Sequence, residues 1–341
     1  GDSFPTYIIG EIGSNHNCNF DTAKKLILAA KKAGCDAAKF QSYTADGLYS
    51  IYTPRISEMD GRTKDEETPY ELIKRIQMPI EWHKPLKEFC DQNKITFCSS
   101  PFDESMVDIL EDIQAPFYKI ASYEITHYPL LEKVAKTGKP IIISTGNSDI
   151  NDIDVAVKVI KKCRNKNIAI LHCVSQYPPA LDDMNILCID TFKKRYPFVI
   201  GFSDHAIDYT PSMLAVSLGA SIIEKHITLD KNYPGPDHPF ALEPAELELL
   251  VDKIRMAERI MGVPEKRVLK SEEENHRIGR RGIIAKKDIK EGSKINQNDF
   301  VIKRPAIGLH PKYLNSIDGL LLLKSIKKDE WLTIDHIDGL L

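Results

Sequence analysis

The sequence has no cysteine pattern typical of a disulfide framework or a zinc site. Its seven cysteines are odd in number and scattered, without a CxxC pair. Several of them lie in apolar stretches, where cysteine behaves as a small buried hydrophobe. This usage argues against a disulfide-bonded secreted domain and favours a reducing compartment, so we expect a cytoplasmic protein.

Long apolar runs and a strong charge of either sign are also missing. No apolar run approaches the roughly 20 residues of a membrane span, and the first ten residues lack the charged-then-apolar pattern of a signal peptide. A net charge of −3 gives no electrostatic reason to expect nucleic acid or an anionic membrane as partner.

Short β-branched runs alternate with helical patterns as far as residue 262. Repetition of strand and helix implies parallel strands joined by crossovers, and eight such units within residues 1–262 predict a closed (β/α)8 TIM barrel. An open, doubly wound sheet is the alternative, but the first strand is not followed by GxGxxG. The predicted strands are Tyr7–Glu11, Ala37–Gln41, Ile95–Ser99, Phe117–Ile120, Ile141–Ser144, Ile168–Cys173, Val199–Ser203 and Ser221–His226.

The pattern changes after residue 262. Residues 263–280 are polar and charged and are predicted to be a linker, whereas residues 281–341 are β-rich. The second segment repeats itself weakly, because Lys287–Lys290 is echoed by Lys324–Lys327 and each is followed by a similar triplet. We expect a compact β-rich domain that is small enough to need support from another surface.

Polar side chains end nearly every predicted strand of the barrel. In a TIM barrel the chemistry gathers at the carboxyl ends of the strands. One polar residue would mean little, because strands commonly end in polar turns, but eight in succession predict a site. The residues are Glu11; Lys39 and Gln41; Ser99 and Ser100; Lys119 and Ser122; Ser144 and Thr145; His172 and Ser175; Asp204 and His205; Glu224 and His226.

One group among these residues is cationic and hydroxylic. It consists of Lys39, Lys119, Ser100, Ser122 and Ser144. Taken alone, each lysine is as well explained as a residue of the rim with its charge in water. Together, at neighbouring strand ends, lysines and hydroxyls favour a small dianionic ligand such as a phosphorylated acid.

A second group is a pair of histidines, His205 and His226, at the ends of the last two strands. Two imidazoles without cysteines suit a divalent ion that keeps positions open for substrate and water. The alternative is a pair of hydrogen-bonded histidines that orient loops. His172, by contrast, lies within the sixth strand and is predicted to be a core histidine.

A third group is acidic and consists of Glu11, Glu224 and Asp237. Carboxylates at a barrel mouth can hold sugar hydroxyls, bind metal-bound water or move protons. Asp237 alone, within Pro234–His238, would by default be interpreted as a turn-forming residue.

Nine short motifs give the chain a family resemblance. In order along the sequence, they resemble those of the N-acetylneuraminate (sialic acid) synthase family. The segment VIKRPAIGLHPK (301–312) resembles the antifreeze-like SAF domain that ends these enzymes, so the similarity extends over essentially the whole chain. The motifs are GEIGSNH (10–16), AKFQ (38–41), SSPF (99–102), YKIAS (118–122), STG (144–146), HCVSQYP (172–178), GFSDH (201–205), IEKH (223–226) and GPDH (235–238).

The resemblance implies a transferase with a TIM barrel and an SAF domain. Its reaction would join phosphoenolpyruvate to open-chain N-acetylmannosamine, with water, and give N-acetylneuraminic acid and phosphate by C–O cleavage. It also implies a homodimer in which the SAF domain of one chain reaches the barrel of the other. Neither nucleic acid nor a membrane is implied as partner.

The resemblance further implies roles for individual residues. His205 and His226 would hold a divalent ion, manganese first and magnesium or cobalt as alternatives, and Glu11 and Glu224 would join them as catalytic groups. Phosphoenolpyruvate would be bound by Lys39, Ser100, Lys119, Ser122, Ser144 and Ser175. The sugar would be bound by Gln41, Tyr177, Asp237 and, from the partner chain, Arg304.

Some features of the sequence depart from the neuraminate pattern. Some bacterial neuraminate synthases have Asn where this chain has Ser175, and residues 51–68 lack the Asn that contacts the sugar there. The stretch KIASYEITHYPLL also resembles spore-coat polysaccharide synthases, and GLHPK occurs in pseudaminic acid synthases, although GPDH leans away from that branch. A legionaminic acid or other nonulosonate synthase is therefore an alternative.

Three further hypotheses lie outside this chemistry. The first is a metal-dependent aldolase that uses pyruvate, and the second is a Schiff-base mechanism through Lys119. The third is a non-catalytic carbohydrate-binding protein, suggested by the antifreeze-like domain.

Overall fold

The protein consists of two compact units, Gly1–Gly262 and Val263–Leu341, each with its own hydrophobic core. The computed structural model describes residues 4–55 and 67–340. Most of the segment 51–68, which departs from the neuraminate pattern, therefore lies outside the described residues. Within the described ranges, no helix combines the length and apolar character needed to cross a membrane.

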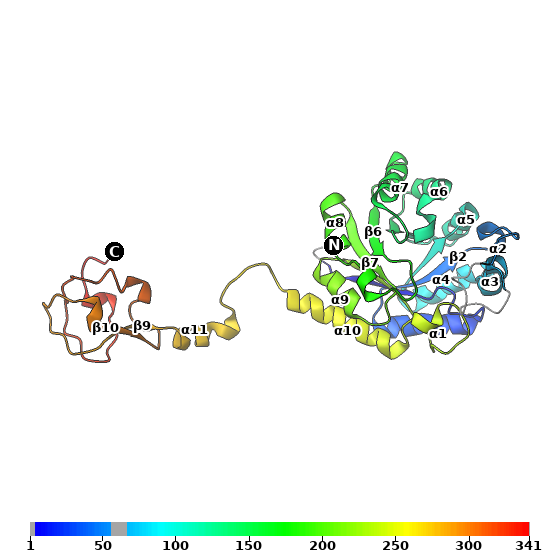
Figure 1. The fold of residues 1–341 in the computed structure, drawn as a ribbon. Helices are drawn as coiled ribbons and strands as arrows, with labels where there is room; N and C mark the ends of the chain where they lie inside the picture. Colours follow the sequence, from blue (N-terminus) through cyan, green and yellow to red (C-terminus); the bar gives the residue numbers. More distant parts are fainter. Residues whose placement is uncertain (1–3, 56–66, 341) are drawn as a thin grey trace. The chain divides into compact units, whose positions relative to one another are not determined.

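The first unit is a closed barrel of eight parallel strands, as predicted (Figure 1). The first strand pairs with the last, Glu11 opposite His226, and this pairing closes the barrel. The observed strands differ from the predicted ones by at most two residues at either end. They are β1 Tyr7–Glu11, β2 Ala37–Ser42, β3 Thr96–Pro101, β4 Tyr118–Ile120, β5 Ile141–Ser144, β6 Ile168–Cys173, β7 Val199–Asp204 and β8 Ile222–His226.

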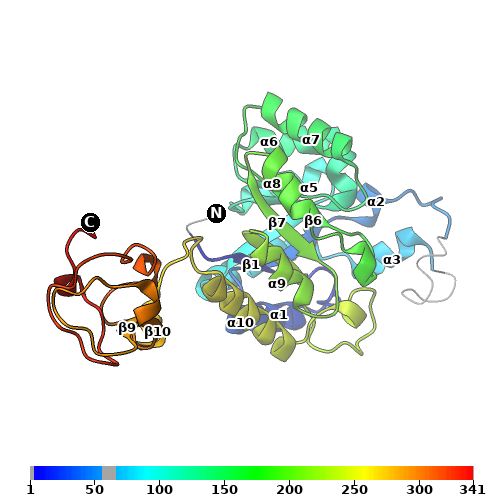
Figure 2. The same cartoon turned by 60° about the vertical axis from the view of Figure 1, so that its left-hand side comes forward.

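Helices surround the strands, and α9, α10 and α1 lie side by side along one flank (Figure 2). Helix α1 shows how the sequence sets the bounds of a helix. At its start Asn19 accepts the amide hydrogen of Thr22, and at its end Gly34 adopts a φ of 91°. The helices of this unit are α1 Phe20–Ala33, α2 Ala45–Leu48, α3 Pro69–Ile76, α4 His83–Gln92, α5 Glu104–Asp112, α6 Tyr128–Lys136, α7 Ile150–Lys162, α8 Cys188–Arg195, α9 Thr210–Ser217 and α10 Pro244–Met261.

Inward-facing side chains change character along the barrel axis. Near the middle of the barrel they are small or apolar, and they form a core of their own that includes Ile9, Ala37, Cys98, Ile142 and Leu171. Two residues further along four of these strands, the same inward face carries a polar or charged side chain: Glu11, Lys39, Ser100 and Ser144. The alternation of strand side chains therefore carries every inward polar residue to the carboxyl end of the barrel.

The amino end of the barrel is apolar. A cavity of about 530 Å³ opens there, lined mainly by hydrophobic side chains such as Tyr7, Phe117, Ile168, Phe198 and Ile222. The two ends of the same strands thus differ sharply in chemistry.

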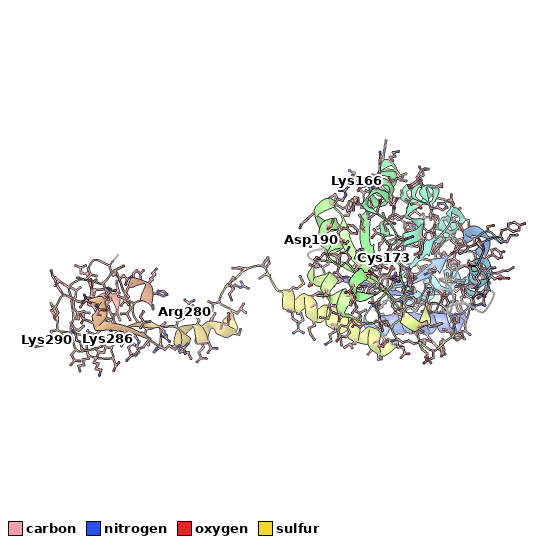
Figure 3. All side chains as sticks on the ribbon, viewed as in Figure 1. Lys166, Cys173, Asp190, Arg280, Lys286 and Lys290 are labelled. Atoms are coloured by element: carbon pink, nitrogen blue, oxygen red, sulfur yellow. The ribbon has the colours of Figure 1, made fainter. Side chains whose placement is uncertain are left out.

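The second unit begins with the polar segment predicted to be a linker, which contains a 3-10 turn, Lys270–Glu272, followed by a short α-helix, α11 Glu273–Gly279. Beyond it, β9 Gly282–Ala285 and β10 Phe300–Lys303 pair antiparallel. Lys286 and Lys290, labelled in Figure 3, belong to the segment of the chain that connects β9 to β10.

The weak sequence repeat has a structural counterpart in the second unit. Ile289 and Ile326, one from each copy, exchange both backbone hydrogen bonds at 2.9 Å. The triplets that follow overlap two similar 3-10 turns, Gln297–Asp299 and Ile334–His336. Both isoleucines are buried in the core of this unit, so the repeat marks two halves that pack on each other.

Candidate active site

Two buried lysines and two buried carboxylates form an ionic cluster at the carboxyl end of the barrel. Lys39 Nζ lies 2.8 Å from Glu11 Oε2 and 3.8 Å from Glu224 Oε2, and Lys119 Nζ lies 3.2 Å from Glu224 Oε1. All four side chains are at most 5 % exposed. The sequence prediction that these strand ends share one site is supported by these distances.

The two carboxyl groups of the cluster differ in acidity. Burial raises the pKa of Glu11 to about 7 against the opposing effect of Lys39. Burial also disfavours the charged form of Glu224, but Lys119 and Lys39 outweigh it and hold its pKa below the usual value. One carboxyl group can therefore exchange a proton near neutral pH while its neighbour remains ionised, an arrangement typical of acid–base sites.

Hydroxyl groups line the strands next to the lysines. Ser100 Oγ lies 3.4 Å from Lys39 Nζ, and Ser122 Oγ accepts the amide hydrogen of Gly146 at 3.0 Å. Ser144 Oγ is buried without a hydrogen-bond partner among the described residues. A buried hydroxyl group without a partner loses free energy unless a ligand or water satisfies it.

Gly146 is required where it stands. A Cβ atom at this position would lie 2.2 Å from Ser175 Oγ, 2.9 Å from Ser122 Oγ and 3.1 Å from Cys173 Sγ. Cys173 ends β6 and lies toward the middle of the barrel unit (Figure 3). The absent side chain thus lets the hydroxyl groups that follow β4 and β6, Ser122 and Ser175, approach the end of β5, as a small anionic ligand would require.

The two predicted histidines face each other. The ring centroids of His205 and His226 are 5.4 Å apart, and the ring of Tyr177 lies 4.2 Å from that of His205. His205 Nδ1 is 2.9 Å from the carbonyl oxygen of Val174, so Nδ1 carries the proton, and in the neutral ring the free lone pair is on Nε2. Burial, followed by His205, lowers the pKa of His226 far below its usual value, which keeps this ring neutral.

The residues around the histidines fit a divalent ion with an incomplete protein shell. His226 Nδ1 is buried and has no hydrogen-bond partner among the described residues; Asp237 Oδ2 lies 4.0 Å away. A backbone carbonyl on the remote nitrogen, as at His205, is typical of metal-binding histidines. Residues 4–55 and 67–340 contain no cluster of three or more potential ligands from His, Cys, Asp and Glu, so substrate and water would have to complete the coordination.

A cavity of about 240 Å³ lies beside His226, which is one of its lining residues. Its polar side includes Gln41, which donates to Glu11 Oε1 at 2.7 Å, and Asp237, which accepts from Ser14 Oγ at 3.1 Å. Its opposite wall is apolar and aromatic. That wall consists of Leu48, Tyr49, Leu72, Ile73, Ile76, Phe102 and Tyr123.

Three residues near this cavity were not predicted from the sequence. Tyr43 and Ser14 line it, and Glu124 is buried, with burial raising the pKa of its carboxyl group to about 6. Tyr43 follows Gln41 at the next inward position, and Ser14 lies within GEIGSNH, so proximity to a motif was the available signal. Glu124 lies in a 3-10 turn after β4, which strand periodicity could not reveal.

Two predicted residues lie elsewhere. His172 Nε2 bonds the carbonyl oxygen of Met184 at 2.8 Å and its ring stacks on Phe202, which confirms the prediction of a core histidine. Arg304 belongs to the second unit, directly after β10, and is exposed there.

The chain matches a known family over most of its length. The NeuB family model matches residues 26–266, and the SAF domain model matches residues 280–338. An uncharacterized protein of Methanocaldococcus jannaschii is 42 % identical over 97 % of this chain and 93 % of its own length. The N,N'-diacetyllegionaminic acid synthase of Campylobacter jejuni is 38 % identical over 95 % of this chain and 98 % of its own length.

A solved structure is similar as well. The N-acetylneuraminic acid synthetase of Leptospira borgpetersenii has a TM-score of 0.70 and 34 % identity, covering 80 % of this chain and 90 % of that chain. Family model, relatives and fold agree with the motifs in the sequence. The chain therefore belongs to the NeuB family of sialic-acid-type synthases.

Proposed function

We propose that this protein joins phosphoenolpyruvate to an open-chain N-acetylated amino sugar, N-acetylmannosamine in the first instance, and releases N-acetylneuraminic acid and phosphate. The observation that carries the proposal is the buried cluster of Lys39 and Lys119, together with the buried hydroxyl group of Ser144 on β5, the strand that pairs with β4. Two buried cations, and a hydroxyl group that has no partner in the described part of the chain, suit an enol phosphate that brings two to three negative charges.

In this proposal the lysines bind phosphoenolpyruvate and stabilise the charge of the departing phosphate. Ser100, Ser122, Ser144 and Ser175 orient it through hydrogen bonds. Because both reactants occupy one enclosed mouth, most of the entropy cost of a two-substrate reaction is met by binding. Glu11 and Glu224 already hold the two lysines in position, so the ammonium groups are ordered before the ligand binds.

The two carboxylates, Glu11 and Glu224, have different roles in this proposal. Glu11, with its pKa near neutral, is placed to take up or release a proton at Oε2, while Gln41 holds Oε1. Glu224 remains ionised beside Lys119 and is held by Ser203 Oγ at 3.0 Å. Its second oxygen, Oε2, is suited to orient the water molecule that the reaction consumes.

A divalent ion, manganese in the first instance, would be held by His205 and His226 and would polarise the sugar's aldehyde as a Lewis acid. Tyr177, Gln41 and Asp237 would hold the sugar beside it, since all three line the adjacent cavity. The neutral state of His226 is the state that a metal ligand requires.

We further propose a homodimer in which Arg304 of one chain contacts the N-acetyl group of the sugar in the partner's barrel. The family resemblance supports this proposal, together with the small core of the second unit. A chain ending at Arg280 should then retain a folded barrel but lose activity. A fully active fragment 1–280 would contradict the proposal.

A second candidate substrate is a diacetamido-trideoxy hexose, as expected of a legionaminic acid synthase. The observation that favours it is the apolar wall of the sugar cavity, on α2, α3 and the turn after β4. No lysine or arginine is among the described residues that line this cavity. Methyl and acetamido groups would pack on such a wall, whereas a phosphate ester would find no cation there.

The substrates can be separated by one panel. The protein is incubated with phosphoenolpyruvate, manganese and each of three sugars: N-acetylmannosamine, its phosphate ester, and the diacetamido-trideoxy hexose. Mass spectrometry identifies the nine-carbon keto acid. We expect a product from one of the two unphosphorylated sugars and the least from the phosphate ester; a preference for the ester would contradict the interpretation of the cavity wall.

A variant of the wall sharpens the same experiment. Ile73→Lys places a cation in the apolar wall and should favour the phosphate ester relative to the other sugars. Lys74→Ile, at the neighbouring position outside the cavity lining, is the matched control and should leave the preference unchanged.

A further inference from the structure

Two fully buried charged residues remain outside the site described above. Asp204 is 0 % exposed and Lys225 is 1 % exposed, and they occupy facing positions on β7 and β8. One residue earlier on each strand, Ser203 and Glu224 meet inside the barrel. Because successive strand side chains point to opposite faces, Asp204 and Lys225 point outward, toward the helical layer.

The outward pair binds the loop that carries His205. Lys225 Nζ lies 2.9 Å from Asp204 Oδ2 and donates to the carbonyl oxygens of Ala206 and, at 3.2 Å, Asp208. Asp204 Oδ1 accepts the amide hydrogen of Ala206 at 2.8 Å.

The same carboxylate reaches the following helix. Asp204 Oδ2 accepts the hydroxyl hydrogen of Ser212, in the first turn of α9, at 2.6 Å. The network therefore joins three segments: the end of β8, the loop after β7, and α9.

Stability alone does not account for a charged pair at this position. A buried ion pair is often no more stabilising than apolar side chains of the same size, because both charges lose their hydration. The preceding outward positions on the same two strands are held by Phe202 and Ile223, which are fully buried apolar residues. Directed hydrogen bonds to a loop are what the charged pair adds over such packing.

We propose that Asp204 and Lys225 are positioning residues that fix His205 and His226 relative to each other. Each charged residue directly precedes one of the histidines in the chain, and the pair links the two strand ends across the outside of the barrel. Both side chains point away from the interior of the barrel, where the substrates are proposed to bind. The inference rests on the proposed role of the histidines in holding a divalent ion.

The test is a double variant, Asp204→Asn with Lys225→Met, which removes both charges without leaving one buried alone. Calorimetric titration with Mn²⁺ should show binding weakened by about 10- to 100-fold, the usual effect of losing a group that orients a metal ligand. Phosphoenolpyruvate binding without metal should change less than about twofold, because its proposed contacts lie on β2 to β6. A general loss of structure would weaken both.

Leu110→Ala is the matched control, since Leu110 is fully buried in the barrel core on α5, away from the histidines. It should lower the melting temperature while leaving Mn²⁺ affinity unchanged. Should the double variant fail to fold, Ser212→Ala removes one donor to Asp204 and should weaken Mn²⁺ binding by about threefold, as expected for a single hydrogen bond.

The outcomes separate this inference from the proposed function. Folded variants of Asp204, Lys225 or Ser212 that bind Mn²⁺ as the wild type does would overturn the positioning role. His205→Ala and His226→Ala should both abolish Mn²⁺ binding. If they do not, the metal role of the histidines is wrong, and the positioning role is overturned with it.

Discussion

The two ends of the barrel are built from the same eight strands but have opposite chemistry. At the amino end, Tyr7, Phe117 and Ile222 line an apolar cavity. At the carboxyl end, Lys39, Glu224 and their neighbours place charges where water hardly reaches. Apolar burial stabilises a fold, whereas buried charge seldom does, so the first end should matter for stability and the second for function.

A pair of substitutions on one strand, β8, tests most strongly whether the carboxyl end serves function and the amino end serves stability. His226→Ala, at the carboxyl end, should lower kcat by at least about 1000-fold, because it removes a proposed metal ligand. The fold should remain intact by circular dichroism. Near-normal activity in this variant would contradict the assignment.

Ile222→Ala, four residues earlier on the same strand, is the counterpart. It should cost about 2–4 kcal/mol of unfolding free energy, as usual for a truncated core isoleucine, while kcat changes by no more than a few-fold. Denaturant titration and steady-state kinetics measure the two effects. If His226→Ala were unfolded and Ile222→Ala were stable but inactive, the assignment of function to the carboxyl end and stability to the amino end would be wrong.

Lys119→Met tests the cationic half of the mouth. It removes one proposed charged contact to phosphoenolpyruvate and should lower kcat/KM for this substrate by about 100-fold, equivalent to ~2.7 kcal/mol. Kinetics at varied phosphoenolpyruvate give the effect. Lys139→Met, at a partly exposed lysine that precedes β5 near the other end of the barrel, should leave kcat/KM unchanged.

Chelation separates the metal from the rest of the site. Excess chelator should abolish turnover, and added Mn²⁺ should restore it. Turnover that persists in excess chelator would remove the metal role while leaving the proposed phosphoenolpyruvate contacts standing.

The smallest expected effect is a change in the pH dependence of stability. The folded-state pKa of Glu11, about 7, exceeds its ordinary value of 4.5, so the folded protein binds this proton more tightly than the unfolded chain does. The contribution to stability is full below about pH 4.5 and is lost as pH rises through about 7. Glu11→Gln should flatten the decline of unfolding free energy over this window; an unchanged slope would show that Glu11 has no raised pKa.

Much of this arrangement could be predicted from the sequence. Strand periodicity gave the order and bounds of the eight strands, because buried parallel strands are short apolar runs between helical patterns. It also gave inward polar residues such as Lys39 and His226, since position along a strand decides both face and end.

The sequence could not reveal contacts that depend on three-dimensional register. Asp204 and Lys225 are 21 residues apart, and only the pairing of β7 with β8 sets them opposite each other. Glu124 was not predicted as a site residue because it lies in a 3-10 turn, which has no strong sequence period. The short helix α11 within a charged segment was not predicted either, because it has no buried face.

The central claim is that one barrel mouth brings together an enol phosphate and an amino sugar, and the release of inorganic phosphate tests it most directly. Phosphate is measured with manganese and phosphoenolpyruvate alone, with the sugar alone, and with both. The account predicts phosphate only when both are present, in equal amount to the sugar consumed. Consumption of pyruvate in place of phosphoenolpyruvate, with borohydride trapping it on Lys119, would contradict it.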